Sequence, residues 1–223
     1  MGTPYAILRI EKLRTTGSLS ATGRHNHRLR PTPNADPQRG IVVLEGTSDV
    51  RKDVQARLPG KLRSNAVLAV QMLLSASPSW FGKNPTRERV EEWTDHCLAW
   101  LESRYGKNCV NVVRHDDESG PHIHAVIVPV KANGRLSCDH FFGTPQKLSE
   151  LQDDFAEGMS SLGLQRGIRK HLTKRGHQDT KRFYAMCNEV DERIDPARAA
   201  AVLHHLTQLT QAQPAMKSGL RPG

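Results

Sequence analysis

The sequence has 223 residues and a mass of 24.9 kDa, enough for one domain with a short appended segment, and 37% of its residues are hydrophobic. No run approaches the ~20 apolar positions that a membrane span needs, and the N-terminus lacks a signal segment, so we expect a cytoplasmic protein with no membrane span. The net charge of +9 favours a polyanionic partner, and four cysteines without a Cys-x-x-Cys pair argue against a zinc ribbon and a disulfide framework.

The first part of the chain is predicted to contain two strands, a long loop and a helix. Alternating side chains at Tyr5–Ile10 favour a strand, and the Gly-, Ser- and Pro-rich residues 15–40 favour a long loop with a single helical turn. A loop of this length is uncommon unless it is functional. Ile41–Leu44 is typical of a short buried strand, and the apolar spacing within Lys61–Ala76 predicts a helix that Pro78 ends.

Three further helices are indicated by capping residues. One begins after an N-cap at Asn84 and ends at Gly106, and the next begins after an N-cap at Thr144 and ends at Gly163. The last begins near Asp195. Each of the three N-terminal residues is followed by a proline, which suits the first turn of a helix.

Between the helices at 84–106 and 144–163, the sequence predicts two strands at Asn111–His115 and His122–Val130, joined by a turn. A further short strand follows a hairpin turn at Asn133-Gly134. Hairpin-connected strands followed by helices predict an α+β domain, with an antiparallel β-sheet and helices packed on one side. We expect this domain to span residues 1–194, with 195–223 forming a C-terminal helix and a tail or linker.

A cluster of histidines carries the strongest chemical signal. Residues i and i+2 of a strand share a face, so His122 and His124 lie side by side, and the turn brings His115 back towards them. Three imidazoles converging from two paired strands suit a metal site with open positions. Glu118, in the turn, would orient a ligand, act as a base or complete the coordination. An exposed His-rich turn without a ligand is the alternative, but the pattern favours a metal.

A second histidine, His25, lies in the basic loop. Alone it would be expected to be solvated, but arginines surround it where a phosphate would be held. Neutral imidazole is a competent nucleophile towards phosphorus, and Arg28 would give bidentate support to phosphate oxygens.

The positive charge is concentrated in two segments. Residues 1–40 carry seven Arg and Lys against two acids, and residues 161–185 carry seven against one. Segregated charge of this kind is typical of a polyanion-binding face, although a basic protein with solvated lysines is also common. The residues expected to bind DNA are Arg24, Arg30, Lys170, Lys174 and Arg175.

Together the two histidine motifs resemble one known family. His-Asn-x-Arg at His25–Arg28, followed by His-x-Asp-Glu-x-x-Pro-His-x-His at His115–His124, resembles the MobV relaxases. These are also called the plasmid recombination (Pre/Mob) family and belong to the HUH endonucleases. The likeness covers about residues 4–187. It departs from the family at Val43–Gly46, where members often have Asn-Tyr-Glu-Leu.

The resemblance implies a role for each residue of the two motifs. It makes His25 the nucleophile, in place of the tyrosine that most relaxases use, and Arg28 the group that holds the scissile phosphate. It makes Glu118 the acidic residue beside the metal. The implied metal ligands are His115, His122 and His124.

The implied enzyme is a metal-dependent relaxase that nicks a plasmid transfer origin for conjugative mobilisation and stays linked to the 5′-phosphate. Mn²⁺ or Mg²⁺ is the expected ion, although three imidazoles also bind Zn²⁺ or Ni²⁺. The expected partners are single-stranded DNA at the origin and coupling or relaxosome proteins. Family members usually continue into a long C-terminal region used for dimerisation, so we expect the chain to be a natural short form or a truncated domain.

Four alternatives stay open. Tyr184 is a rival nucleophile, and with Phe183 it would otherwise stack on bases or lie in the core. A rolling-circle replication initiator of the HUH group would place a tyrosine in the helix after residue 144, where none occurs before Tyr184. A non-catalytic DNA-binding protein with a structural metal leaves the loop at His25 unexplained. A generic metallohydrolase would act on small substrates without a covalent adduct.

Overall fold

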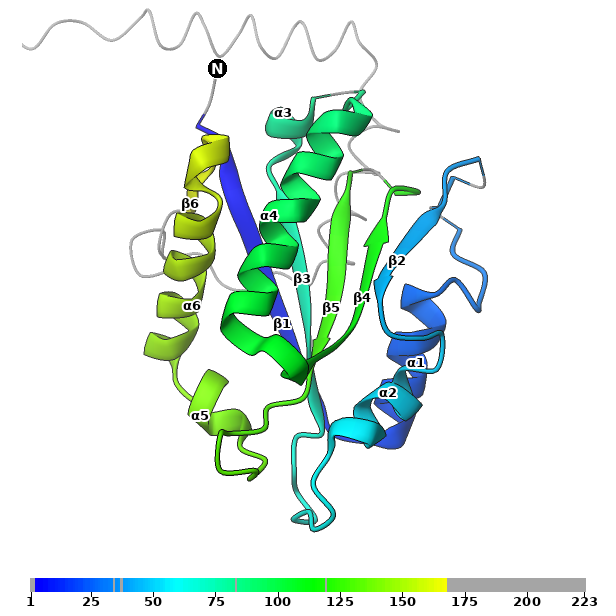
Figure 1. Cartoon of the computed structure of the whole chain (residues 1–223). Coiled ribbons are helices and arrows are strands. Elements are labelled where there is room, and N and C mark those ends of the chain that lie inside the picture. The colour runs from blue at the N-terminus through cyan, green and yellow to red at the C-terminus, as the bar shows by residue number, and fades with distance from the viewer. Residues whose placement is uncertain (1–2, 34, 37, 83, 119, 168–223) are drawn as a thin grey trace, which may run out of the picture. The chain divides into compact units, whose positions relative to one another are not determined.

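The computed structural model describes residues 3–167 except 34, 37, 83 and 119, and these residues form a six-stranded sheet with flanking helices (Figure 1). The strand order is β2-β4-β5-β3-β1-β6, and neighbours are antiparallel except for the parallel pair β1 and β6. The strands are β1 (Tyr5–Leu13), β2 (Ile41–Glu45), β3 (Ala69–Ala76), β4 (Cys109–His115), β5 (His122–Ile127) and β6 (Gln165–Arg166). The predicted α+β class is confirmed. The helix predicted from Asp195 and the boundary at residue 194 lie outside the described residues.

Six helices accompany the sheet in the described part of the chain. They are α1 (Thr16–Asn26), α2 (Val50–Arg57), α3 (Pro78–Phe81), α4 (Arg87–Tyr105), α5 (Cys138–Phe142) and α6 (Pro145–Gly158). None of them is long and apolar enough to cross a membrane.

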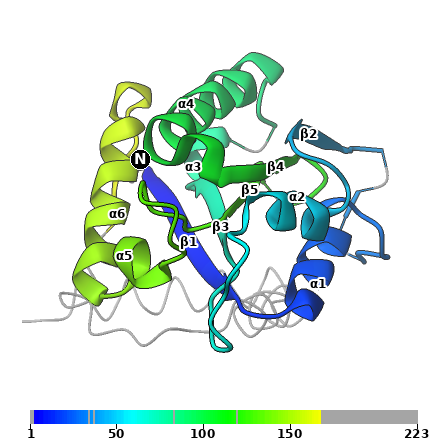
Figure 2. The same ribbon diagram turned by 60° about the horizontal axis from the view of Figure 1, so that its bottom comes forward.

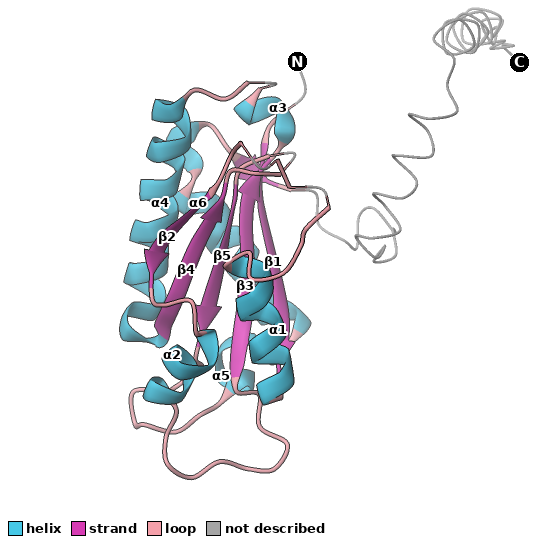
Figure 3. Ribbon diagram, turned by 90° about the vertical axis from the view of Figure 1, so that its right-hand side faces the viewer, coloured by secondary structure: helices cyan, strands magenta, loops and turns pink. Residues whose placement is uncertain are grey.

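Helices cover both faces of the sheet, which corrects the expectation that they pack on one side (Figures 2 and 3). Because side chains alternate along a strand, Ile123 and Ala125 of β5 point into a large core. That core contains Trp93 of α4 and Phe155 of α6. On the opposite face, Val126 belongs to a second, smaller core. This smaller core is built with α1 and α2 from Leu13, Leu19, Val50, Val54, Ala69, Val126, Val128 and Val130.

The helix predicted for Lys61–Ala76 is wrong, because the second half of this range is strand β3. Its buried side chains alternate at Val70, Met72, Leu74 and Ala76, which is the period of a strand. A spacing of four residues, as between Val70 and Leu74, fits a helix and a strand equally well. The segment forms a strand because it pairs with both neighbouring strands, β1 and β5.

The long loop predicted for residues 15–40 is also corrected, because residues 16–26 form helix α1. Thr15 and Ser18 make a reciprocal capping box at its start, the hydroxyl of Thr15 accepting from the Ser18 amide over 3.0 Å. Leu19 is buried, and a Cβ added at Gly23 would lie 3.3 Å from Val50 of α2. Close packing against α2 therefore stabilises a helix that a run of Gly, Ser and Thr does not favour by itself.

Two smaller expectations are corrected as well. Strand β2 is an exposed edge rather than a buried strand, with Val42 and Val43 exposed by 37% and 49%. Helix α4 is capped by Thr86, whose hydroxyl accepts from the Arg89 amide, and not by Asn84.

The remaining sequence signals are confirmed in part, because α6 ends at Gly158 and β5 at Ile127, short of the predicted Gly163 and Val130, and the strand predicted after Asn133-Gly134 is a single bridge. Helix α4 ends at Gly106, and α6 begins after its N-cap Thr144. The turn at Asn133-Gly134 brings Val130 opposite Leu136, with Gly134 at a φ of 77°. These turns leave β4 and β5 as adjacent central strands, and the turn between them carries the histidine motif.

Candidate metal centre and histidine cluster

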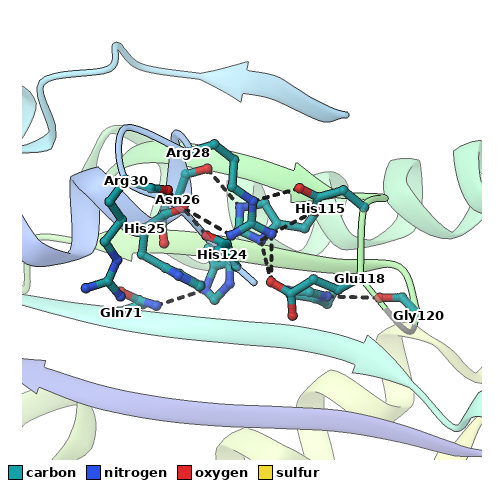
Figure 4. A network of polar contacts seen from close by, with 12 residues as sticks. His25, Asn26, Arg28, Arg30, Gln71, His115, Glu118, Gly120 and His124 are labelled. Atoms are coloured by element: carbon teal, nitrogen blue, oxygen red, sulfur yellow. Dashed lines mark hydrogen bonds and ion pairs between the residues drawn. The ribbon is translucent and has the colours of Figure 1, made fainter. Parts of the chain in front are cut away.

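Three histidines meet on the face of the sheet that carries α1, and two of them, His115 and His124, are labelled in Figure 4. In the register of β4 and β5, His115 lies opposite His122, and His124 follows on the same face. The ring centroids of His115 are 5.0 Å from His122 and 4.6 Å from His124, and those of His122 and His124 are 5.0 Å apart. The structure therefore brings together the three residues that the sequence assigns to a metal.

A fourth histidine reaches the same cluster from α1. The ring of His25 approaches His115 and His124 edge-to-face, with centroid distances of 5.5 Å and 5.2 Å. Two overlapping groups have donor atoms within 4.8 Å of one another: His25 with His115 and His124, and Glu118 with His115 and His122. His25 lies in the last turn of α1 and not in a flexible loop, so the helix holds its ring over the cluster.

The donor set fits a divalent metal ion. Nδ1 of His122 donates to the carbonyl of Gly120 over 2.9 Å, which leaves the Nε2 lone pair free to coordinate. Nε2 of His124 is buried and has no hydrogen-bond partner among the described residues, which is unusual for a buried polar atom unless it binds a ligand.

Gln71, on the neighbouring strand β3, contacts the other nitrogen of His124. Nε2 of Gln71 lies 2.8 Å from Nδ1 of His124. Exchanging the oxygen and nitrogen positions of the Gln71 side-chain amide would place Oε1 beside Nδ1 of His124. The oxygen then accepts the Nδ1 proton, and Nε2 of His124 is left free as a metal ligand. Gln71 is thus placed to select the tautomer that binds metal.

Arg28 ties the end of α1 to the turn between β4 and β5. Its Nε and Nη2 donate to the carboxylate of Asp117 over 2.7 Å, and Nη2 also donates to Glu118 over 2.6 Å. Arg28 has a φ of 53°, the left-handed conformation that helix ends usually give to glycine. The amides of Arg28 and Leu29 close the helix by donating to the carbonyls of His25 and Arg24.

Burial and nearby positive charge favour the neutral form of His25, His115 and His124 by lowering the pKa of each. Burial lowers the pKa of His115 to about 3, and burial together with the other histidines lowers the pKa of His124. Burial and the charge of Arg28 lower the pKa of His25. The hydrogen bonds from Arg28 lower the pKa of Asp117. Neutral imidazole is the form that binds a metal or attacks phosphorus.

A buried polar network fixes the end of α1 on the sheet. Nε2 of His27, the C-cap residue of the helix, lies 3.3 Å from Oδ1 of Asn111 on β4. The side-chain nitrogen Nδ2 of Asn111 donates to the backbone carbonyl of Thr47 and to the carboxylate of Asp53. A Cβ at Gly46 would come within 2.7 Å of Asn111, so only glycine fits beside this network. His27 thereby anchors the helix turn that carries His25.

Of the residues expected to bind DNA, two lie in the described part of the chain. Arg24 and Arg30 are exposed on and after α1, and the charge of Arg30 contributes to the low pKa of His25. The others, together with Tyr184, are outside the described residues. The three cysteines described carry no disulfide, and burial raises the pKa of the Cys97 thiol.

Sequence reasoning missed three residues of this site: Asp117, Gln71 and Asn111. Asp117 had a signal, because it lies in an acidic run next to the assigned Glu118. Gln71 is a single polar residue in an apolar run, which becomes informative once that run is known to be a strand. Asn111 had no distinguishing signal, because its partners are Thr47, Asp53 and His27, which lie far from it in the sequence.

The chain belongs to the plasmid recombination enzyme (Mob_Pre) family, whose model matches residues 3–185. It is 36% identical over 209 residues to a "65 kDa protein" of Zymomonas mobilis, covering 89% of this chain and 35% of that protein. It is 28% identical over 190 residues to plasmid recombination enzyme type 1 of Staphylococcus aureus, covering 78% of this chain and 47% of that one. The chain thus spans about a third to a half of these relatives.

A solved structure shares the fold. The MobM relaxase domain (MOBV; Mob_Pre), in an Mn-bound crystal structure with plasmid pMV158 oriT DNA, superposes with a TM-score of 0.71 at 23% identity. The match covers 82% of this chain and 99% of that domain. The mixed sheet with its helices is therefore the fold of that relaxase domain.

Proposed function

We propose that this chain is the DNA-nicking domain of a plasmid mobilisation relaxase, a metal-dependent and site-specific single-strand endonuclease that joins itself to the cut strand. The observation that carries the proposal is the approach of His25 to the three-histidine cluster, with 5.2 Å between the ring centroids of His25 and His124. Membership of the plasmid recombination enzyme family supports it, as does the oriT DNA bound to the structurally similar MobM domain.

His25 would act as the nucleophile. Its lowered pKa keeps a ring nitrogen unprotonated near neutral pH, and α1 holds that ring beside the metal ligands. The ring nitrogen would attack the scissile phosphorus in line, forming a P–N bond as the P–O3′ bond breaks. The 3′-oxygen would take up a proton from solvent water and leave as a hydroxyl, while the other ring nitrogen of His25 gives up its proton. Glu118, whose charge raises the pKa of His25, would accept that proton.

A divalent ion, Mn²⁺ or Mg²⁺ first and Zn²⁺ or Ni²⁺ as alternatives, would be held by His115, His122 and His124 and would offset negative charge on the scissile phosphate. Arg28 and Arg30 add positive charge beside His25, where a phosphate would be bound. Arg28 would exchange one of its contacts with Asp117 or Glu118 for a phosphate oxygen. Because the phosphoramidate keeps the energy of the broken bond, the same site can rejoin DNA ends after transfer.

Transfer-origin DNA would enter as a single strand and contact Arg24 and Arg30, as well as Lys170, Lys174 and Arg175. Because phosphate contacts supply the affinity, binding should weaken steeply as salt is raised. Coupling or relaxosome proteins, and a second copy of the protein, are the proposed partners in the cell.

The decisive experiment is a nicking assay on supercoiled plasmid with the cognate transfer origin, with Mn²⁺ or Mg²⁺ and with chelator. Products are run on a denaturing gel to detect protein attached to the 5′ end. We expect a metal-dependent adduct in the wild type and in Tyr184→Phe, and none in His25→Ala. His140→Ala, outside the cluster, serves as the matched control and should nick normally.

The chemical stability of the adduct separates the two nucleophiles. A histidine phosphoramidate is cleaved by mild acid, whereas a tyrosine phosphodiester survives it. An acid-stable adduct that persists in His25→Ala would move the nucleophile to a tyrosine. DNA binding with neither nick nor adduct, on the correct origin with metal, would overturn the enzyme assignment.

A further inference from the structure

The donor atoms of the histidine cluster fall into two overlapping groups. In the first, His25, His115 and His124 each place one nitrogen within 4.8 Å of the other two. In the second, His115 and His122 share that spacing with a carboxylate oxygen of Glu118. The view in Figure 4 places His25 and Glu118 on opposite sides of His124. The cluster therefore offers two positions for an ion, and the first of them involves the residue proposed as the nucleophile.

The first group has the spacing of ligands on one tetrahedral ion. Zinc binds imidazole nitrogens at about 2.0–2.1 Å, which puts the ring centroids of two bound imidazoles about 5 Å apart. The ring centroid of His25 lies 5.5 Å from that of His115 and 5.2 Å from that of His124. The centroids of His115 and His124 are 4.6 Å apart. Small rotations of the three side chains would therefore bring three nitrogens onto one ion.

The first group is also open to an ion from solvent. Nε2 of His124 is buried and has no hydrogen-bond partner in the part of the chain that the structure describes, which suits a nitrogen that binds a ligand. His115 and His124 are buried, whereas His25 is half-buried at the end of α1. An ion that enters past His25 would meet all three rings.

The two groups suit different ions. Three imidazoles without a carboxylate favour Zn²⁺ and Ni²⁺, whereas the carboxylate of Glu118 favours Mn²⁺ or Mg²⁺ in the second group. Both groups contain His115, and a neutral imidazole has a single nitrogen lone pair. An ion in one group therefore excludes an ion from the other.

We propose that Zn²⁺ and Ni²⁺ bind the first group and thereby turn the nucleophile into a metal ligand, which blocks the site reversibly. The inference rests on the proposed function, because it takes His25 as the nucleophile. The bound ion occupies the lone pair with which His25 would attack phosphorus, and it also takes His115 away from the position that Mn²⁺ or Mg²⁺ would use. Zn²⁺ and Ni²⁺ are then inhibitors and not substitutes for Mn²⁺.

Isothermal titration calorimetry on the untagged chain without DNA tests which residues hold each ion. Zn²⁺ and Mn²⁺ are titrated into the wild type, His25→Ala and His122→Ala, with His140→Ala as the matched control outside the cluster. His122 belongs to the second group and His25 to the first, so the two variants separate the two positions. Thermal melting checks that each variant folds.

We expect His25→Ala to weaken Zn²⁺ binding by about 100-fold, because even a group that only orients a ligand contributes about 10- to 100-fold. Its Mn²⁺ affinity should be unchanged. His122→Ala should show the reverse pattern, and His140→Ala should match the wild type for both ions. An unchanged Zn²⁺ affinity in His25→Ala, or equal weakening of both ions, would overturn the proposal.

Chemical labelling of the wild type makes the same test without a substitution. Diethyl pyrocarbonate modifies neutral imidazoles that hold no metal, and mass spectrometry locates the modified residues, with the exposed His140 as internal reference. We expect Zn²⁺ to protect His25, and Mn²⁺ to leave it as reactive as in chelator. Equal labelling of His25 in Zn²⁺ and in chelator would overturn the proposal. Neither measurement contains DNA, so a failure of the nicking function is distinguishable from a failure of this metal position.

Discussion

Nη2 of Arg28 donates to Nδ1 of His115 over 3.0 Å, while Nε2 of the same histidine donates to the carbonyl of Asn26 over 2.8 Å. A carbonyl only accepts, so the proton lies on Nε2, and Nδ1 is the nitrogen with a lone pair. The arginine therefore occupies the atom of His115 that a metal ion would need. Metal binding at His115 and this arginine contact exclude each other.

Loading with metal should stabilise the folded chain. A ligand that binds only the native state at a hundred times its dissociation constant adds about 2.7 kcal/mol, which corresponds to a rise in Tm of roughly 5 °C or more for a chain of this size. We expect this rise with Mn²⁺ and its reversal by chelator, measured by differential scanning fluorimetry. His124→Ala should lose the response, and an equal rise in that variant would place the ion elsewhere.

Arg28→Ala should bind Mn²⁺ several-fold more tightly than the wild type while losing nicking activity. The substitution frees Nδ1 of His115 and removes a positive charge that repels the ion, at about 1 kcal/mol or more for charges this close. Isothermal titration calorimetry measures the affinity, and Arg28→Lys, which keeps the charge, is the control. Weaker binding in Arg28→Ala would mean that this arginine holds the ligands in place and does not compete with the ion.

The left-handed backbone of Arg28 gives a second prediction about the same position. Arg28→Gly and Arg28→Ala both delete the ion pairs with Asp117 and Glu118, but only glycine adopts a φ of 53° without steric cost. The glycine variant should therefore be more stable by about 1 kcal/mol, measured by urea unfolding. Equal stabilities would show that the helix end relaxes in both variants.

Gln71→Leu should weaken metal binding by about 10- to 100-fold, the usual effect of removing a group that orients a ligand. The variant deletes the partner of Nδ1 of His124 and leaves the ring free to adopt either tautomer. Gln71→Glu, which keeps an acceptor oxygen, should retain or strengthen binding. Mn²⁺ affinity followed by electron paramagnetic resonance gives the readout, and equal affinities in the two variants would contradict the role assigned to Gln71.

The depressed histidine pKa values predict loss of stability in acid. Without metal, His115 stays neutral in the folded chain down to its pKa of about 3, whereas the unfolded chain takes up a proton at about 6.5. The unfolded state then binds more protons, so stability is complete above pH 6.5 and falls by about 1.4 kcal/mol per unit below it. Urea unfolding at several pH values in chelator measures the slope. His115→Gln should reduce it, and an unchanged slope would assign the effect to other groups.

The sequence predicted which histidines gather at the site better than it predicted the elements that surround them. The histidine motif could be placed because alternation along a strand and a tight turn are local rules, and β4 and β5 obey them. Helix α1 could not be foreseen from its glycines and serines, because its stability comes from packing on α2. The strand pattern of β3 was hidden because Val70 and Leu74, four residues apart, fit the helical period as well as the strand period. Gln71 and Asn111 depend on which elements become neighbours, and only the fold reveals that.

Strand β5 is held in register on both edges, by β3 and by β4. A slip of β5 by one residue against both neighbours would turn His122 and His124 to the opposite face, into the core that contains Trp93. The pairing on both edges therefore keeps the two imidazoles on one face while residue types in the turn change. Distant relatives of this protein should keep the two-residue spacing of His122 and His124 after most of the surrounding sequence has diverged.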